Sequence, residues 1–227
     1  MKDELVAISL MMFATLYLSD PYGLLASMAI SAILVVVMVY SPVIKLGNMY
    51  WSLSRSFTML SNSGNNAFMQ RVTLEEEGFT TLWAMLGPIA YVPTLFILKH
   101  AGSGLDTALI TRVMFVAAIM SLLLIREVSA NPRGVAVKFS RVSILLSATA
   151  LFLINAAGHA LSDAVSITLL SSYLATLLVT DVRNIPYLAS NGSTNIILGG
   201  YGTRDALVIV PISSASLVWI ILQAIST

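Results

Sequence analysis

The chain has 227 residues, of which 57% are hydrophobic and only 10% carry a charge, and its mean hydropathy is +0.88. A composition this apolar excludes an ordinary water-soluble domain and indicates an integral membrane protein. The net charge of +1 provides no basic surface for nucleic acid, and the absence of cysteine excludes disulfides and thiolate metal sites.

Apolar runs long enough to cross a bilayer divide most of the chain, since a spanning helix needs about 20 apolar residues. The runs that qualify are 24 to 46, 79 to 98, 106 to 125, 141 to 161, 164 to 181 and 206 to 225. A shorter run, 5 to 19, is also expected to span, because Met1 to Glu4 is too weakly basic for a secretory signal. We therefore predict an all-α polytopic fold, a single domain over 1 to 227, with about seven transmembrane helices.

The basic residues predict the orientation of these spans. If the chain has seven spans, two basic residues, Lys99 and Arg112, lie on the side opposite the N-terminus. The other ten lie on the N-terminal side: Lys2, Lys45, Arg55, Arg71, Arg126, Arg133, Lys138, Arg141, Arg183 and Arg204. Basic residues concentrate in cytoplasmic loops, so the N-terminus is expected to be cytoplasmic. The expected location is a prokaryotic plasma membrane.

The longest connection, 47 to 77, is expected to be a cytoplasmic loop. Within it Tyr50, Leu53, Phe57 and Leu60 recur at helical spacing, which predicts a short helix lying in the membrane interface. An ordered loop is the alternative, because the apolar stripe covers only about three turns.

Arg112 is expected about two turns inside the run 106 to 125, where an arginine usually pairs with a carboxylate. Asp106 and Asp163 are the candidate partners. The two histidines, His100 and His159, are expected at helix ends on the same side. His159 and Asp163 are four residues apart, but a metal site needs at least one more ligand. We expect no metal and no other cofactor.

Two aspartates flank the Gly- and Asn-rich segment 182 to 204, which is expected to be a loop. Asp181 ends one apolar run and Asp205 begins the last. Because consecutive spans are antiparallel, both carboxyl groups are expected at the cytoplasmic ends of neighbouring helices. When two carboxyl groups lie close together where water is partly excluded, ionising both costs much free energy, so one keeps its proton. One would activate water as a base while the other polarises a peptide carbonyl, so we predict that Asp181 and Asp205 are catalytic.

The residues around this pair are assigned to substrate binding. They are Asn184, Gly199, Gly200, Gly202 and Thr203. The glycines would let an extended substrate strand or a backbone turn come close, since they carry no side chain.

A purely structural role, without catalysis, is an alternative for the same residues. Arg183 and Arg204 are two residues and one residue away from the aspartates, and a crossed pairing would clamp the loop and neutralise every charge. Asp205 also has the position of an N-cap for the last helix. An anion-binding glycine loop is a weaker third option, because the carboxylate of Asp205 opposes it.

From Thr176 onward the sequence resembles the C-terminal signature of a family of prokaryotic membrane proteins, that of domain of unknown function 1614. The matching positions are Thr176, Leu177, Asp181, Asn184, Gly192, Gly199, Gly200, Gly202, Thr203 and Asp205. The resemblance covers about 50 of the 227 residues. The resemblance implies membership of a membrane-protein family but no particular activity.

The same segment is more loosely similar to the GxGD aspartyl proteases, meaning presenilin, signal peptide peptidase and prepilin peptidase. Those enzymes have one Asp at the end of one helix and another directly after a Gly-x-Gly at the start of the next. Here Thr203 and Arg204 separate Gly202 from Asp205, and Thr180 precedes Asp181 where presenilins have tyrosine. The resemblance implies intramembrane proteolysis, and these departures weaken it.

Three classes of function follow from the sequence. The first is a membrane protein with a two-aspartate hydrolytic centre that acts on a membrane-protein substrate. The second is a carrier or channel, in which Asp181 or Asp205 binds a proton or cation and Pro88, Pro93 and Pro211 supply bends. The third is a structural subunit that contacts the lipid bilayer and partner subunits.

Overall fold

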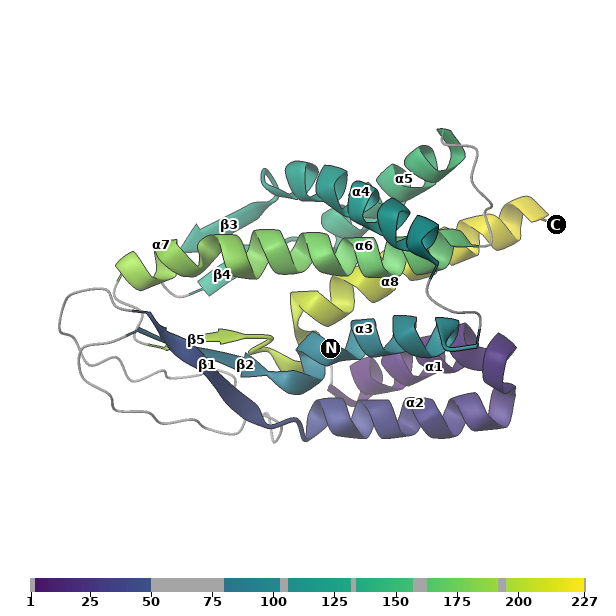
Figure 1. The fold of residues 1–227 in the computed structure, drawn as a ribbon, viewed down its shortest axis with the longest axis horizontal. Coiled ribbons are helices and arrows are strands. Elements are labelled where there is room, and N and C mark those ends of the chain that lie inside the picture. The colour runs from purple at the N-terminus through teal and green to yellow at the C-terminus, as the bar shows by residue number, and fades with distance from the viewer. Residues whose placement is uncertain are drawn as a thin grey trace.

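The protein is a bundle of helices with two small sheets at one end (Figure 1). The computed structural model describes residues 3–49, 80–102, 106–131, 134–156, 163–191 and 195–226. Two expectations lie outside these residues. They are the interfacial helix of the 47 to 77 connection, of which only 47 to 49 are described, and any role of His159.

The described helices are α1 (Asp3–Tyr22), α2 (Leu24–Val39), α3 (Leu86–His100), α4 (Thr107–Leu124), α5 (Phe139–Ala156), α6 (Ala164–Thr176), α7 (Ile185–Ser190) and α8 (Ala206–Ser226). A π-helical turn, Leu177–Asp181, and a 3₁₀ turn, Val182–Asn184, join α6 to α7. The strands are β1 (Val43–Met49), β2 (Thr80–Met85), β3 (Val128–Asn131), β4 (Gly134–Val137) and β5 (Asn195–Leu198).

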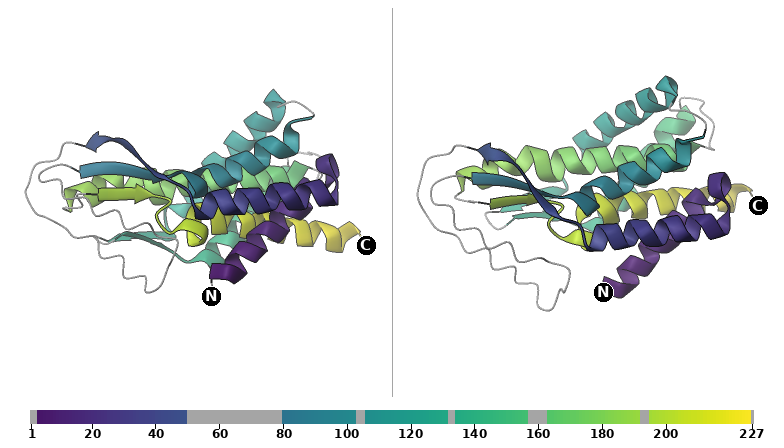
Figure 2. Two further views of the ribbon diagram at one scale, coloured as in Figure 1. Left: turned by 90° about the horizontal axis from the view of Figure 1, so that it is seen from below. Right: turned by 60° about the horizontal axis from the view of Figure 1, so that its bottom comes forward.

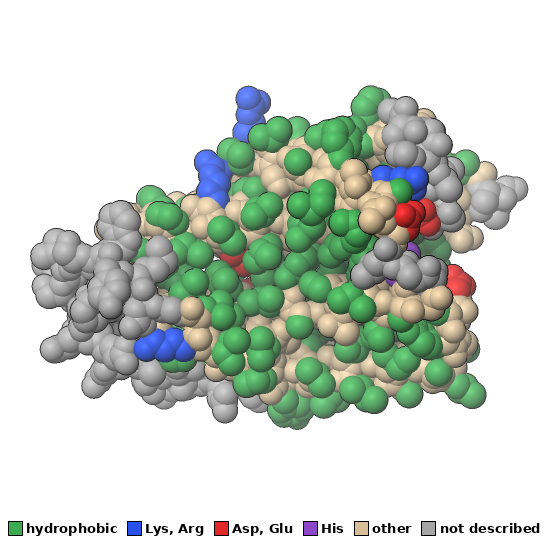
Figure 3. All heavy atoms as spheres, viewed as in Figure 1, with side chains coloured by type: hydrophobic (Ala, Val, Ile, Leu, Met, Phe, Trp, Pro, Cys, Tyr) green, Lys and Arg blue, Asp and Glu red, His purple; other side chains and the backbone are tan. Residues whose placement is uncertain are grey.

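Several helices are long and apolar enough to cross a membrane, which confirms the predicted helical membrane class. Among the described residues four segments meet both criteria: Glu4–Tyr22, Thr107–Leu124, Ala164–Ser190 and Ala206–Ile225. The helices Leu24–Val39 and Phe139–Asn155 are apolar but shorter. Green hydrophobic side chains cover much of the face in Figure 3. Exposed large hydrophobic residues of the molecule include Phe115 and Phe152. An apolar surface of this extent is suited to lipid and not to water.

Two of the predicted spans are shorter as helices than the apolar runs that suggested them. The run 24 to 46 is helical only to Val39, and its last residues form β1. Pro42 explains the break, because it has no N–H to donate and its ring disfavours a helical conformation of the residue before it. The run 79 to 98 begins as β2 and becomes helical only at Leu86, directly before Gly87 and Pro88.

The two strands at the ends of these runs, β1 and β2, form one three-stranded sheet with β5. The strand order is β1-β2-β5, with β1 and β2 antiparallel and β2 and β5 parallel. Leu82 is opposite Ile196, and the Trp83 indole donates a 3.1 Å hydrogen bond from Nε1 to Oδ1 of Asn195. Each strand thus satisfies its backbone groups against segments more than 30 residues away. A second sheet is the β3–β4 hairpin.

The sheets share one end of the bundle, and the helices run lengthwise from it. Figures 1 and 2 show both sheets, α7 and the start of α8 at this end, which we call the sheet end. The turn between α1 and α2 and the last turns of α8 lie at the opposite end. Successive helical segments connect alternately at the two ends (Figure 1).

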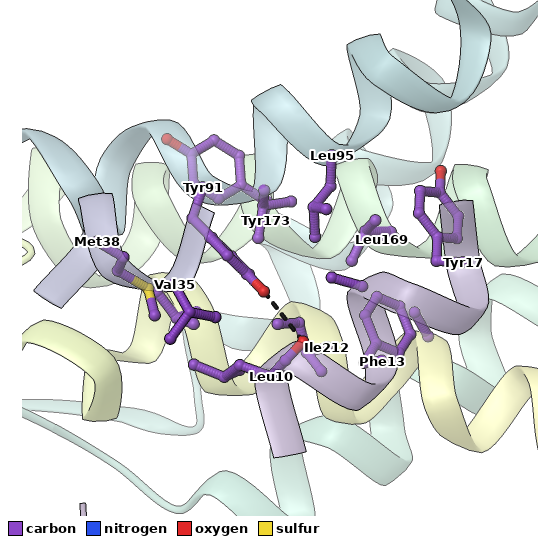
Figure 4. Packing of buried hydrophobic residues seen from close by; sticks show 14 of the residues in the cluster. Leu10, Phe13, Tyr17, Val35, Met38, Tyr91, Leu95, Leu169, Tyr173 and Ile212 are labelled. Carbon is purple, nitrogen blue, oxygen red and sulfur yellow. Dashed lines mark hydrogen bonds between the residues drawn. The ribbon is translucent and has the colours of Figure 1, made fainter. Parts of the chain in front are cut away.

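Helices α6 and α8 form the centre of the packing, because both contribute to two buried clusters. One cluster joins them to α1, α2 and α3, through residues such as Leu169, Tyr173 and Ile212 (Figure 4). The other joins them to α4 and α5. α2 and α3 come very close at Gly87, where a Cβ atom would lie 2.5 Å from the Cα of Met38. The helix that leads to Asp181, α6, therefore packs against other helices on two sides.

Candidate functional site at the ends of α6 and α8

Asp181 is the last residue of a π-helical turn and not the last residue of a helix. The chain continues through the 3₁₀ turn into α7, so the first part of the predicted loop 182 to 204 is helical, and 195 to 198 form β5. Asn184 explains the continuation. Its side-chain Nδ2 donates to the carbonyls of Val179 and Thr180 at 2.7 and 2.9 Å, which supplies donors where the helix widens. π-helical turns of this kind are frequent at functional sites.

The Asp181 carboxyl group lies in a partly buried place with few donors. Its Oδ1 accepts a 3.1 Å hydrogen bond from the Thr180 hydroxyl, which also donates to the carbonyl of Thr176 at 2.8 Å. Its Oδ2 is buried and has no hydrogen-bond partner among the described residues. Because a buried carboxyl oxygen without a donor is costly, this atom is suited to receive a proton or a ligand.

Asp205 caps the N-terminus of α8. Its Oδ1 accepts from the backbone N–H of Leu207 at 2.9 Å, and its Oδ2 accepts from that of Tyr201 at 3.2 Å. The side chain is almost fully buried, with 6% of the residue exposed. Burial raises the pKa of Asp205, and the two backbone hydrogen bonds oppose that rise. The predicted N-cap position is confirmed.

The two aspartates lie close enough to interact electrostatically. Asp205 lies at the start of α8 and Asp181 in the turn after α6, and Tyr173, a buried residue about two turns before Asp181, lies in the same region. Figure 3 shows an acidic side chain at the bottom of a small opening between the α6–α7 segment and the three-stranded sheet. The antiparallel helices thus bring together the two residues that the sequence predicted as a pair.

The glycine segment that precedes Asp205 is a compact turn. Gly199 and Gly202 have φ angles of 70° and 60°, a left-handed conformation that favours glycine. Thr203 is buried within the turn, which also includes Gly200. These four predicted substrate-binding residues therefore lie beside Asp205. The fifth, Asn184, lies beyond Asp181 with its amide engaged by the helix carbonyls.

The crossed arginine clamp stays a prediction. Ion pairs between described residues include Lys99–Asp20, with 2.8 Å between Nζ and Oδ2, and Arg112–Asp163, with 3.6 Å between Nη1 and Oδ2. Arg183 is exposed. Asp205 accepts hydrogen bonds from backbone N–H groups, and Asp181 accepts one from the Thr180 hydroxyl.

The opposite end of the bundle holds the pair expected for Arg112. Asp163 is its partner, while Asp106 caps α4 by accepting from the N–H of Ala108 at 3.0 Å. His100 lies nearby and packs against the Phe96 ring with centroids 4.7 Å apart. Within the described ranges, no three acidic or imidazole side chains gather closely enough to hold a metal ion.

No pattern in the sequence pointed to the role of Tyr173. Its hydroxyl donates a 2.7 Å hydrogen bond to the carbonyl of Ile89 in α3 and lies near both aspartates. The one signal that could have indicated it is Pro93, which removes the helical donor for that carbonyl.

No family model, curated protein or solved structure matches this chain. The resemblance of the C-terminal segment to domain of unknown function 1614 and to GxGD proteases stays a prediction.

Proposed function

We propose that the chain is a multi-pass plasma-membrane protein with seven spans, and that Asp181 and Asp205 form a hydrolytic centre for a membrane-embedded polypeptide. The observation that carries the proposal is the proximity of two carboxyl groups shielded from water: Asp205 is buried at the start of α8, and Asp181, whose Oδ2 is buried, lies in the π-helical turn after α6. Paired carboxyl groups in a dehydrated place are the arrangement that activates water in aspartic proteases.

The chemistry assigns different roles to the two acids. Two backbone N–H groups and the N-terminus of α8 favour the charged form at Asp205, which makes it the better general base. Asp205 then takes a proton from water as the water oxygen attacks the peptide carbonyl carbon. Asp181 gives its proton to the carbonyl oxygen. When the C–N bond breaks, the nitrogen receives a proton from the pair and the peptide is released as an acid and an amine.

The distribution of charge supports a cytoplasmic sheet end. Among the described residues, basic side chains at this end are Lys45, Arg126, Lys138, Arg141, Arg183 and Arg204. The opposite end has Lys99 and Arg112. A cytoplasmic sheet end agrees with the positive-inside tendency and places the aspartates near the inner leaflet. Because the chain has no cysteine, single cysteines introduced at each end would report this orientation through labelling by a membrane-impermeant thiol reagent.

The decisive test replaces each aspartate with asparagine and follows cleavage of a co-expressed single-span reporter. Asp181→Asn and Asp205→Asn should each abolish cleavage while the protein is still inserted at normal levels, since either change removes a proton-transfer group. Asp20→Asn is the control, because Asp20 is an exposed carboxylate at the other end of the bundle. Cleavage that survives either aspartate substitution would end the proposal.

Ion or solute transport is a second candidate that one observation favours. Buried hydroxyl residues recur every four positions along α6 and into the π-helical turn, and they lead to Asp181: Thr168, Ser172, Thr176 and Thr180. Each hydroxyl donates its hydrogen to a helix carbonyl. The lone pairs of the hydroxyl oxygen can then accept a hydrogen bond from a proton carrier or contact a cation. In liposomes, Asp181→Asn should then change ion-dependent flux, and unaltered flux would remove this candidate.

A further inference from the structure

Helix α3 forms a third side of the aspartate site. The glycine turn that leads to Asp205 lies directly on the start of α3, because a methyl group at Gly199 would lie 3.0 Å from Cβ of Pro88 and 3.4 Å from the carbonyl oxygen of Met85. α3 is in turn anchored to the end of α2, where Ser41 Oγ accepts from the N–H of Gly87. The site therefore depends on where the first turns of α3 lie.

The first turns of α3 lack one of their own hydrogen bonds. In a regular helix the carbonyl of Ile89 would accept from the N–H of residue 93, but that residue is Pro93 and has no N–H. Tyr173 supplies the missing donor from α6, with 2.7 Å between its hydroxyl oxygen and the Ile89 carbonyl oxygen. Because Tyr173 is 3% exposed, water does not readily take its place.

Tyr173 lies on the segment that leads to Asp181, which it precedes by about two helical turns. Ile89, whose carbonyl it contacts, also lies against the glycine turn that leads to Asp205, since a Cβ atom at Gly199 would lie 3.6 Å from its Cγ1. Tyr173 thus connects the α6 side of the site to the α3 side. Tyr91 in α3 makes a comparable bond to the Leu10 carbonyl (dashed in Figure 4), but Leu10 is in a helix whose residue 14 is an alanine with its own N–H.

We infer that Tyr173 is a positioning residue for the aspartate pair: through the Ile89 carbonyl it holds the proline-containing start of α3 against the site. The inference rests on the proposed function only in treating Asp181 and Asp205 as the site. Losing the hydroxyl should let the start of α3 move and change how reagents reach the two carboxyl groups. Restoring a backbone donor at position 93 should make the hydroxyl dispensable.

The experiment is a double-mutant cycle on the full chain in liposomes, with Tyr173→Phe, Pro93→Ala and the double variant. The probe is a hydrophobic carbodiimide, which reacts with protonated carboxyl groups in apolar surroundings, and adducts at Asp181 and Asp205 are measured by mass spectrometry across a range of pH. Tyr91→Phe is the matched control, because it removes a buried tyrosine hydroxyl from the same cluster without leaving a proline-orphaned carbonyl.

Tyr173→Phe should change the labelling rate or its pH profile by at least about twofold, the lower end of coupling between contacting groups. In the Pro93→Ala background the same substitution should have little effect, and Tyr91→Phe should leave labelling unchanged. If only the single Tyr173 variant fails to fold, recovery of folding in the double variant supports the inference equally. Unchanged labelling, equal effects in both backgrounds, or failure of both variants to fold would overturn it. Labelling needs no turnover, so failure to detect hydrolysis is a separate result.

Discussion

The capping role of Asp205 leads to a prediction in which two variants are ranked by stability. Asp205→Ala removes both acceptors, which leaves the N–H groups of Leu207 and Tyr201 without partners at the buried start of α8. The expected loss is about 1–3 kcal/mol, combining the cost of a lost N-cap with that of unsatisfied donors. Asp205→Asn keeps an oxygen for Leu207, and asparagine caps helices about as well as aspartate. Its expected loss is below about 1 kcal/mol.

The measurement is a thermal unfolding curve in detergent. For a chain of this length 1 kcal/mol corresponds to about 2–4 °C, so the alanine variant should melt several degrees below the asparagine variant. This ranking matters for the proposed function, since it makes Asp205→Asn a variant that loses a proton-transfer group while the helix start stays formed. Equal melting temperatures for the two variants would refute the capping argument.

The pH dependence of the same variants tests the effect of burial. A carboxyl group whose pKa is raised by folding binds its proton more tightly in the folded protein, and burial raises that of Asp205 above its ordinary 3.8. The stability it contributes is complete below about pH 4 and falls as the pH rises toward the folded-state pKa. The unfolding temperature of the unmodified protein should therefore decline over this window more steeply than that of Asp205→Asn. Parallel curves would show that burial of this carboxyl group has no such effect.

Other contacts give predictions of defined size. Gly87→Ala should destabilise by about 1–3 kcal/mol because its Cβ would lie 2.5 Å from the α2 backbone, whereas Gly102→Ala, with nothing within 4 Å, should be tolerated; similar melting temperatures would contradict this. Asn184→Ala should speed amide hydrogen exchange in the π-helical turn, since two carbonyls lose their side-chain donor. A cycle of Arg112→Gln and Asp163→Asn should give a coupling of at most about 1 kcal/mol, because both side chains are partly exposed, and a much larger value would indicate a desolvated pair.

Local patterns in the sequence were sufficient for the helical membrane class and for several individual contacts. The runs 106 to 125 and 206 to 225 agree closely with α4 and α8, because an uninterrupted apolar run of this length specifies a helix without help from its neighbours. Helix-end rules gave the N-cap position of Asp205 and narrowed the partner of Arg112 to two aspartates, of which Asp163 makes the pair. The seven-span count and its orientation stay predictions, since four of the described helices reach spanning length.

Contacts between segments distant in the sequence decided the sheet, the helix after Asp181 and the arrangement of the site. No local pattern in the sequence encodes these contacts. β2 is apolar enough to continue as a helix, yet it pairs with β5 more than 100 residues later, and this partner satisfies its backbone. The helix beyond Asp181 depends on the side chain of Asn184, and the bond of Tyr173 to Ile89 joins residues 84 positions apart. The sequence by itself determined which segments are apolar, because burial in lipid depends on composition. It also showed that an aspartate lies at one end of each of the last two apolar runs. Tertiary structure decided that the acids lie in the same region, because only the packing of α6, α8 and α3 brings the segments that carry them together.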